Sequence, residues 1–175
     1  MSIRKILSYP EKSLMEKSTQ IDLIDDEIRT LIEDMGETMF DAQGVGLAAP
    51  QIGVNKRVIV YDIRAGKSDD DGSENKFRAL INPEIIEAQG SVISEKEACL
   101  SVPDYRADVK RYDTVTVKAM DIESNPLEFK AEGLFSVILQ HEIDHLNGIL
   151  YIQRISVLKR TLYKKKIQQK LKKHP

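Results

Sequence analysis

The sequence predicts an α+β fold, with antiparallel β-sheets around a buried central helix, an N-terminal helix and a basic C-terminal helix. Three observations lead to this prediction. Apolar residues recur at helical spacing across residues 24–39, short β-branched runs fill the middle of the chain, and residues 134–146 are apolar almost all round. A chain of 175 residues has the size of one domain, so we expect a domain over residues 1–155 and an appended helix over residues 156–175.

The first helix is predicted by a single apolar stripe. Its residues fall at i, i+4, i+7, i+8, i+11 and i+15, and they are Ile24, Ile28, Leu31, Ile32, Met35 and Met39. Asp22, Asp25 and Asp26 stand where acidic side chains stabilise a helix N-terminus. The stripe ends as the chain enters the glycine-rich segment that begins at Gly44.

Four runs have the composition of β-strands. Residues 57–63 and 78–82 are short and apolar, and we expect Pro83 to stop the second of them. Residues 112–119 alternate, so that Val115 and Val117 share one face, and residues 126–131 form a partner strand after the turn at Asn125-Pro126. Residues 66–76 contain almost nothing that can be buried, which predicts an exposed loop.

Two helices follow the strands. Residues 134–146 are apolar on nearly every side, which is typical of a buried helix, and Asn147-Gly148 is a plausible stop. The last helix, over residues 156–172, has only a narrow apolar stripe.

Composition excludes several classes of protein. The chain is 41% hydrophobic and 31% charged, as in a globular domain, and it has no apolar run of the roughly 18 residues that a spanning helix needs. Its first residues form a segment that is too short and too polar for a signal peptide. The single cysteine, Cys99, rules out an internal disulfide. We therefore expect a cytoplasmic protein that does not contact membranes.

Charge is distributed unevenly along the chain. The net charge is −2, yet residues 146–175 carry nine Lys or Arg and no Asp or Glu, while residues 1–145 carry 17 basic and 28 acidic residues. A basic tail on an acidic body indicates a polyanionic partner. A solvated, lysine-rich helix without a partner explains the same pattern equally well.

The buried helix contains an unusual polar segment, Gln140-His141-Glu142-Ile143-Asp144-His145. His141 and His145, at i and i+4, lie on one face of a helix, where two imidazoles can bind one metal ion. Glu142 lies about 100° around the helix from His141, where it can move the proton of a water held by that metal. The alternative is a pair of hydrogen-bonded core histidines, with Glu142 paired to a lysine.

A catalytic site of this kind needs a third protein ligand and one open position. No Asp, Glu or Cys follows His145, which disfavours the usual layout of helical metalloproteases. The upstream candidate is Cys99, although a lone cysteine is more often a small buried hydrophobe.

The glycine-rich segment 44–53 lacks the patterns of phosphate-binding loops. By itself it indicates a helix stop followed by a loop. Gln51 is its one side chain with a hydrogen-bond donor, so it is a candidate for stabilising an oxyanion.

These three segments together resemble the peptide deformylases. That family carries Gly-x-Gly-Leu-Ala-Ala-x-Gln, Glu-Gly-Cys-Leu-Ser and Gln-His-Glu-x-Asp-His stretches in this order, and the corresponding residues here are 44–51, 97–101 and 140–145. The resemblance extends to about residue 155. One departure is Ala98, where the family usually has glycine. A methyl group there is expected to narrow the substrate cleft or to shift Cys99.

The resemblance implies a metal-dependent hydrolase that removes the N-formyl group from the N-terminal methionine of newly synthesised proteins, with a metal-bound water attacking the formyl carbon. Cys99, His141 and His145 would bind one divalent metal, natively Fe(II), with Zn, Ni or Co as substitutes. Glu142 would be the general acid/base, and the Gln51 side chain and Leu100 amide would stabilise the oxyanion. The implied substrate-binding residues are Val45, Gly46, Arg106, Leu134, Val137 and Ile138.

The partner implied by the resemblance is a formyl-methionyl nascent polypeptide. The basic tail resembles the helix with which some members of the family dock on ribosomal RNA, and we expect a monomer. Two other functions are weighed against this one. A metallopeptidase that cleaves internal bonds is disfavoured by the cysteine ligand, and an RNA-binding protein with a structural metal lacks a fourth ligand in a plausible place.

Overall fold

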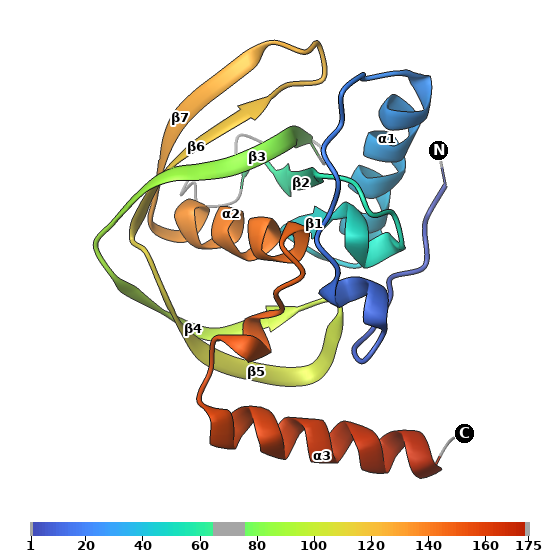
Figure 1. Ribbon diagram of the computed structural model, residues 1–175, viewed down its shortest axis with the longest axis vertical. Coiled ribbons are helices and arrows are strands. Elements are labelled where there is room, and N and C mark those ends of the chain that lie inside the picture. The colour runs from blue at the N-terminus through green and yellow to red at the C-terminus, as the bar shows by residue number, and fades with distance from the viewer. Residues whose placement is uncertain (1, 65–75, 174–175) are drawn as a thin grey trace.

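A computed structural model describes residues 2–64 and 76–173, and it shows the predicted α+β fold with antiparallel sheets and three α-helices (Figure 1). The helices are α1 (Asp26–Asp41), α2 (Gly133–Leu146) and α3 (Val157–Lys173). Short 3₁₀ helices occupy Lys12–Met15, Ala49–Ile52 and Tyr151–Gln153. No helix within the described ranges is long and apolar enough to span a bilayer.

The strands form two antiparallel sheets. The larger sheet has the order β1-β2-β3-β6-β7. Its strands are β1 (Gly46–Ala48), β2 (Val58–Asp62), β3 (Phe77–Gln89), β6 (Thr114–Met120) and β7 (Pro126–Glu132). The smaller sheet is a hairpin of β4 (Val92–Cys99) and β5 (Val102–Arg111), which lies across α2 from the larger sheet (Figure 1).

The core is built on both faces of β2. Val58 and Val60 pack in one cluster with α1, while Ile59 and Tyr61 pack in another with α2. Because α1 and α2 cover opposite faces of this strand, every residue of β2 is buried. This explains why the run predicted over residues 57–63 shows no polar alternation.

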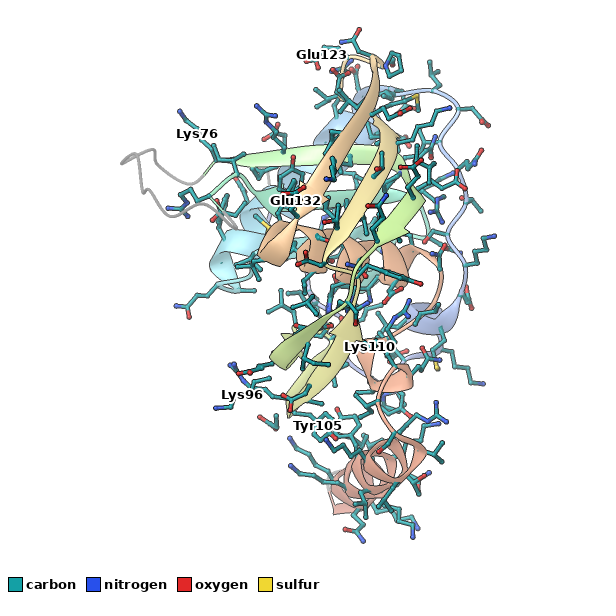
Figure 2. The ribbon with its side chains drawn as sticks, turned by 90° about the vertical axis from the view of Figure 1, so that its left-hand side faces the viewer. Lys76, Lys96, Tyr105, Lys110, Glu123 and Glu132 are labelled. Carbon is teal, nitrogen blue, oxygen red and sulfur yellow. The ribbon has the colours of Figure 1, made fainter. Side chains whose placement is uncertain are left out.

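Helix α3 packs on the β4–β5 hairpin through a third cluster (Figure 1). Tyr163 and Ile167 are its buried residues, and the centroid of the Tyr163 ring lies 4.6 Å from that of Tyr105 in β5. Tyr105 lies at the end of the hairpin that is nearest to α3 (Figure 2). The other apolar side chains of the helix are at least half exposed, at Val157, Leu158, Leu162 and Leu171. Only part of the narrow stripe is therefore covered.

Several predicted elements agree with the structure. Helix α1 begins one residue after Asp25, whose side chain accepts a hydrogen bond from the Ile28 amide at 2.9 Å and so caps the helix. In β6, Val115 and Val117 face the core, and β7 pairs with β6 as expected. Residues 65–75, nearly all of the loop expected over residues 66–76, lie outside the described part of the chain.

One prediction about the strands was wrong. Pro83 does not end the strand that contains residues 78–82, because β3 continues to Gln89. The pairing of β3 with β6 shifts register between Ile81 and Glu84, and Asn82 adopts a left-handed φ of 52°. A proline has no amide hydrogen to donate, and an irregularity in the ladder is where a sheet tolerates one.

Candidate metal centre

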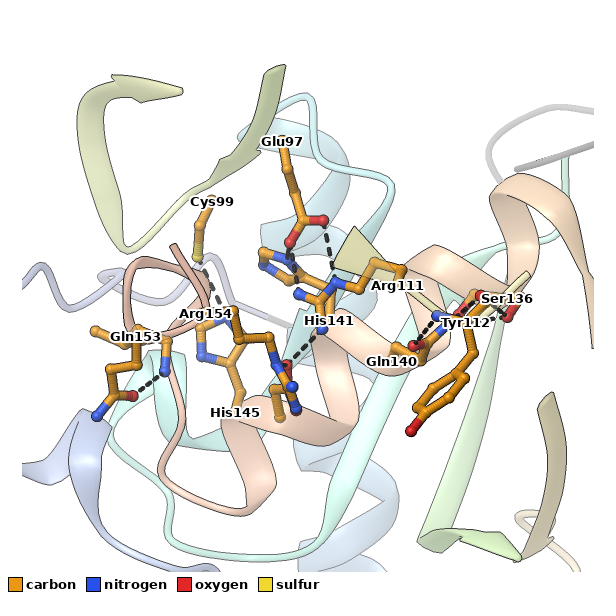
Figure 3. Close-up of polar contacts among 12 residues, drawn as sticks. Glu97, Cys99, Arg111, Tyr112, Ser136, Gln140, His141, His145, Gln153 and Arg154 are labelled. Carbon is orange, nitrogen blue, oxygen red and sulfur yellow. Dashed lines mark hydrogen bonds and ion pairs between the residues drawn. The ribbon is translucent and has the colours of Figure 1, made fainter. Parts of the chain in front are cut away.

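Helix α2 brings the polar segment of the sequence into the interior. Gln140, His141, Glu142, Asp144 and His145 are all buried, each with at most 9% of its surface exposed. Burying such polar groups without hydrogen-bond partners costs free energy, so we expect partners on the neighbouring elements. The β4–β5 hairpin, which crosses over the helix, supplies partners for His141, Asp144 and His145 (Figure 3). Gln140 instead forms hydrogen bonds with Tyr112 and Ser136.

Cys99, His141 and His145 converge on one point. One ligand atom from each residue, the sulfur or a ring nitrogen, lies within 4.8 Å of the other two. The cysteine sulfur at the end of β4 lies 3.2 Å from Nε2 of His145, and the two imidazole rings are 5.1 Å apart. A thiolate and two imidazoles form a donor set that zinc and iron accept, so the residues present fit a metal ion.

The orientation of the His141 ring is fixed by a hydrogen bond from Nδ1. Its Nδ1 donates a hydrogen bond of 2.7 Å to Oε1 of Glu97, which leaves Nε2 as the nitrogen available for a metal. Arg111 in turn donates to both oxygens of Glu97, at 2.6 and 3.2 Å. A carboxylate that holds the second nitrogen of a histidine is a common support for metal ligands.

Burial and charged neighbours shift the pKa values of Glu97 and the two histidines. Burial alone would raise the pKa of Glu97, but hydrogen bonds from His141 and Arg111 lower it to about 2. Burial would lower the pKa of His141, yet its interactions with Cys99 and Glu97 raise it well above the ordinary value. The pKa of His145 moves the other way, well below its ordinary value, because the ring is buried and faces the positive charges of His141 and Arg111. A neutral imidazole is the form that binds a metal.

Glu142 stands beside this cluster without a full set of partners. It is 5% exposed, and its Oε2 makes no hydrogen bond within the described residues. Burial raises its pKa to about 7, with the neighbouring charges partly opposing one another. A carboxyl group that titrates near neutrality is suited to accept and donate a proton.

Gln51 directs its amide group toward the cysteine. Its Oε1 accepts a hydrogen bond of 2.8 Å from the Ala48 amide, which fixes the side chain. Its Nε2 lies 3.6 Å from the Cys99 sulfur and 3.2 Å from the Ser101 hydroxyl. A fixed N–H donor in this position can stabilise negative charge that develops on an oxygen near the cluster.

A cleft of about 1,020 Å³ opens onto the cluster. The predicted site residues that line it are Val45, Gly46, Gln51, Cys99, Leu100, Arg106, Leu134, Val137, Ile138, His141 and Glu142. His145 does not line the cleft and is 1% exposed, so it lies beneath the floor. A cavity of about 970 Å³ between α1, β3 and the β6–β7 hairpin has none of these residues in its lining.

Comparison with known proteins agrees with this geometry. The family model described as Polypeptide deformylase matches residues 3–161. The chain belongs to the peptide deformylase family. These enzymes remove N-formyl groups from nascent peptides, and the family confirms that the chain is an enzyme.

Relatives in this family match the chain over almost its whole length. The peptide deformylase of Desulfosudis oleivorans is 45% identical over 172 residues, which cover 98% of this chain and 96% of the relative. The crystal structure of a peptide deformylase from Legionella pneumophila shares 42% identity with a TM-score of 0.86 and covers 99% of both chains. A peptide deformylase from Ehrlichia chaffeensis in complex with actinonin shares 38% identity with a TM-score of 0.87, over 97% of this chain and 98% of that one.

The residues that support His141 are not predicted from the sequence. Glu97 and Asp144 stand within the recognised motifs without a role of their own, and Arg111 stands outside them. Little in the sequence marks these residues, because Glu97 directly follows two other charged residues although it is the one buried residue of β4. Their role depends on the pairing of β4 with β5, which brings these charges together over α2.

Proposed function

We propose that the chain removes the formyl group from the N-terminal methionine of nascent proteins, with one divalent metal held by Cys99, His141 and His145. The observation that carries this proposal is the meeting of three ligand atoms within 4.8 Å beside a buried Glu142 in the lining of an open cleft. When bound, the metal lowers the pKa of a water molecule and so supplies the nucleophile that attacks the formyl carbon.

The protein's own groups do the remaining work. Glu142 takes a proton at its carboxylate and delivers it to the nitrogen of the leaving amine, for which a pKa of about 7 is suitable. The Nε2 of Gln51 and the amide of Leu100 donate hydrogen bonds to the oxygen of the formyl group as it gains negative charge. The Gln51 side chain is held in place before the reaction by its hydrogen bond from the Ala48 amide, so little reorganisation of this donor is needed.

The cleft supplies the binding site for the formyl-methionyl peptide. Leu134, Val137 and Ile138 form its apolar part and accept the methionine side chain, while the backbone at Val45 and Gly46 pairs with the peptide. Arg106 also lines the cleft, and in this proposal it contacts the chain that follows the methionine.

We propose Fe(II) as the native metal, with Zn, Ni or Co as substitutes, because a thiolate and two imidazoles bind all of these. We further propose that residues 1–155 are the catalytic domain of a cytoplasmic monomer. The family match through residue 161 supports an enzyme domain that covers most of the chain.

Residues 156–175 are proposed to dock on ribosomal RNA. Helix α3 attaches to the domain through Tyr163 and Ile167, which leaves its lysine-rich face in solvent. Lysine side chains on an exposed helix bind phosphates without sequence preference and in a salt-dependent manner.

The test is an anaerobic assay of the Fe(II)-loaded protein with formyl-Met-Ala-Ser. We expect Glu142→Ala to keep one metal per chain and to lose at least 100-fold in kcat, and Cys99→Ser to lose metal. Glu27→Ala, an exposed glutamate of α1, is the matched control and is expected to behave as the wild type. A protein that binds one metal and releases no formate would refute the proposal, as would full activity of Glu142→Ala.

A further inference from the structure

A continuous chain of ion pairs runs from the base of α3 to His141 (Figure 3). Arg154, which follows the 3₁₀ helix Tyr151–Gln153, forms a two-point contact with the carboxylate of Asp144, with Nε 2.5 Å from Oδ2. Asp144 contacts Nη1 of Arg111 at 2.6 Å, and Arg111 contacts Glu97. Glu97 then accepts the Nδ1 proton of His141.

Arg154 balances the charge of this network. The carboxylates of Glu97 and Asp144 are both buried, with side-chain exposures of 6% and 7%, and the buried guanidinium of Arg111 lies between them. The second positive charge comes from Arg154, whose side chain is 41% exposed. Without Arg154, two buried carboxylates would compete for the guanidinium of Arg111. A buried charge that lacks a partner strongly destabilises a protein.

The geometry shows where that competition would act. Arg111 uses Nε and Nη2 to hold Glu97, and only Nη1 contacts Asp144. An Asp144 carboxylate without Arg154 would draw Arg111 toward itself and weaken the two contacts that hold Glu97. Since Glu97 orients the ring of His141, the effect would reach the nitrogen that faces the metal site.

We propose that Arg154 is a positioning residue, which commits Arg111 to Glu97 by pairing with Asp144 and thereby fixes the imidazole of His141 for metal binding. The proposal rests on the metal-binding role of His141 given above. It also connects the residue that leads into α3 with His141 through three intervening side chains.

The test measures metal release and does not depend on deformylation. Arg154→Ala, Arg154→Lys and Arg154→Gln are loaded with Co(II), and the loss of the cobalt absorption bands to a chelator is followed. We expect Arg154→Ala and Arg154→Gln to release metal at least about tenfold faster, as supports of metal ligands do when removed. Arg154→Lys keeps the charge, and it should restore most of the difference. Arg29→Ala, on the exposed face of α1, should match the wild type.

A double-mutant cycle separates this role from a general loss of stability. If Arg154 acts through Glu97, then adding Arg154→Ala to Glu97→Gln should change the release rate by less than twofold. Equal release rates for wild type and Arg154→Ala would overturn the proposal, as would full additivity in the cycle. Faster metal release in a protein without deformylase activity would refute the proposed function and leave this inference standing.

Discussion

Gly46 and Glu142 meet at the cleft so closely that no side chain fits between them. A Cβ atom at residue 46 would lie 2.5 Å from Oε1 of Glu142 and 2.9 Å from its Cδ. Real side chains do not approach at such distances, so any substitution must move the carboxylate. Strand β1, which begins at Gly46, therefore determines where Glu142 can hold a proton.

This contact predicts that Gly46→Ala lowers kcat by about 100-fold, because displacing a reacting group by about 1 Å has effects of that size. Metal content, measured on the same samples, should stay at the wild-type level, because the three atoms nearest to a Cβ at residue 46 all belong to Glu142. Glu142→Asp has a shorter side chain, so Gly46→Ala should cost it much less than it costs the wild type. An equal loss in both backgrounds would show that the glycine acts by another route.

The ligand cluster could be predicted from the sequence because part of it is local. The i, i+4 spacing of His141 and His145 places both rings on one face of a helix, and the structure brings these rings within 5.1 Å. Cys99 required the additional argument that no other ligand follows His145. The contact between Gly46 and Glu142 could not be predicted, since it depends on how β1 packs against α2.

The fold was predictable where burial is one-sided. Helix α1 and strand β6 have a polar face and a buried face, so periodicity reveals them. Strands β4 and β5 escaped prediction because charged residues such as Glu97 and Arg111 occupy their inward positions, facing α2. Pro83 predicted the end of a strand wrongly because β3 accommodates the proline at a shift of register between Ile81 and Glu84.

Ala98 gives a prediction about substrate choice. It is exposed and lines the cleft next to Cys99, so its methyl group occupies space that a substrate would use. We expect Ala98→Gly to raise kcat/KM by up to about tenfold for formyl-methionyl peptides with a bulky second residue. This is the lower end of the change in kcat/KM that one methylene causes in a closed pocket. The metal content should not change. An unchanged ratio between bulky and small second residues would show that the methyl does not limit the cleft.

The exposed lysines of α3 give a prediction about ribosome binding. Lys165, Lys166 and Lys172 are exposed, and replacing all three by Gln should decrease co-sedimentation with ribosomes and flatten its dependence on salt. Deleting residues 156–175 would also uncover Tyr105 and Tyr151, which pack in the same cluster as Tyr163, so the substitution is the cleaner test. Deformylation of a free tripeptide should be unaffected by the substitution. Unchanged sedimentation of the variant at low salt would remove the basis for this role.

Asp34 gives a prediction about stability and pH. Its buried carboxylate in α1 accepts hydrogen bonds from the amide of Ser2 at 2.6 Å and from Nε of Arg4 at 2.8 Å. Burial would raise the pKa of Asp34, but these partners lower it below the ordinary value of 3.8. A lowered pKa stabilises the folded protein above about pH 4, and this contribution is lost as the pH falls through the folded-state pKa.

We expect Asp34→Asn to lower Tm by about 3–10 °C between pH 6 and 8, because hydrogen bonds to a charged group are worth about 1.5–3 kcal/mol. The difference in Tm between the two proteins should shrink below pH 4, and a difference that grows on acidification would contradict the assignment. Asp22→Asn, an exposed aspartate before α1, is the matched control.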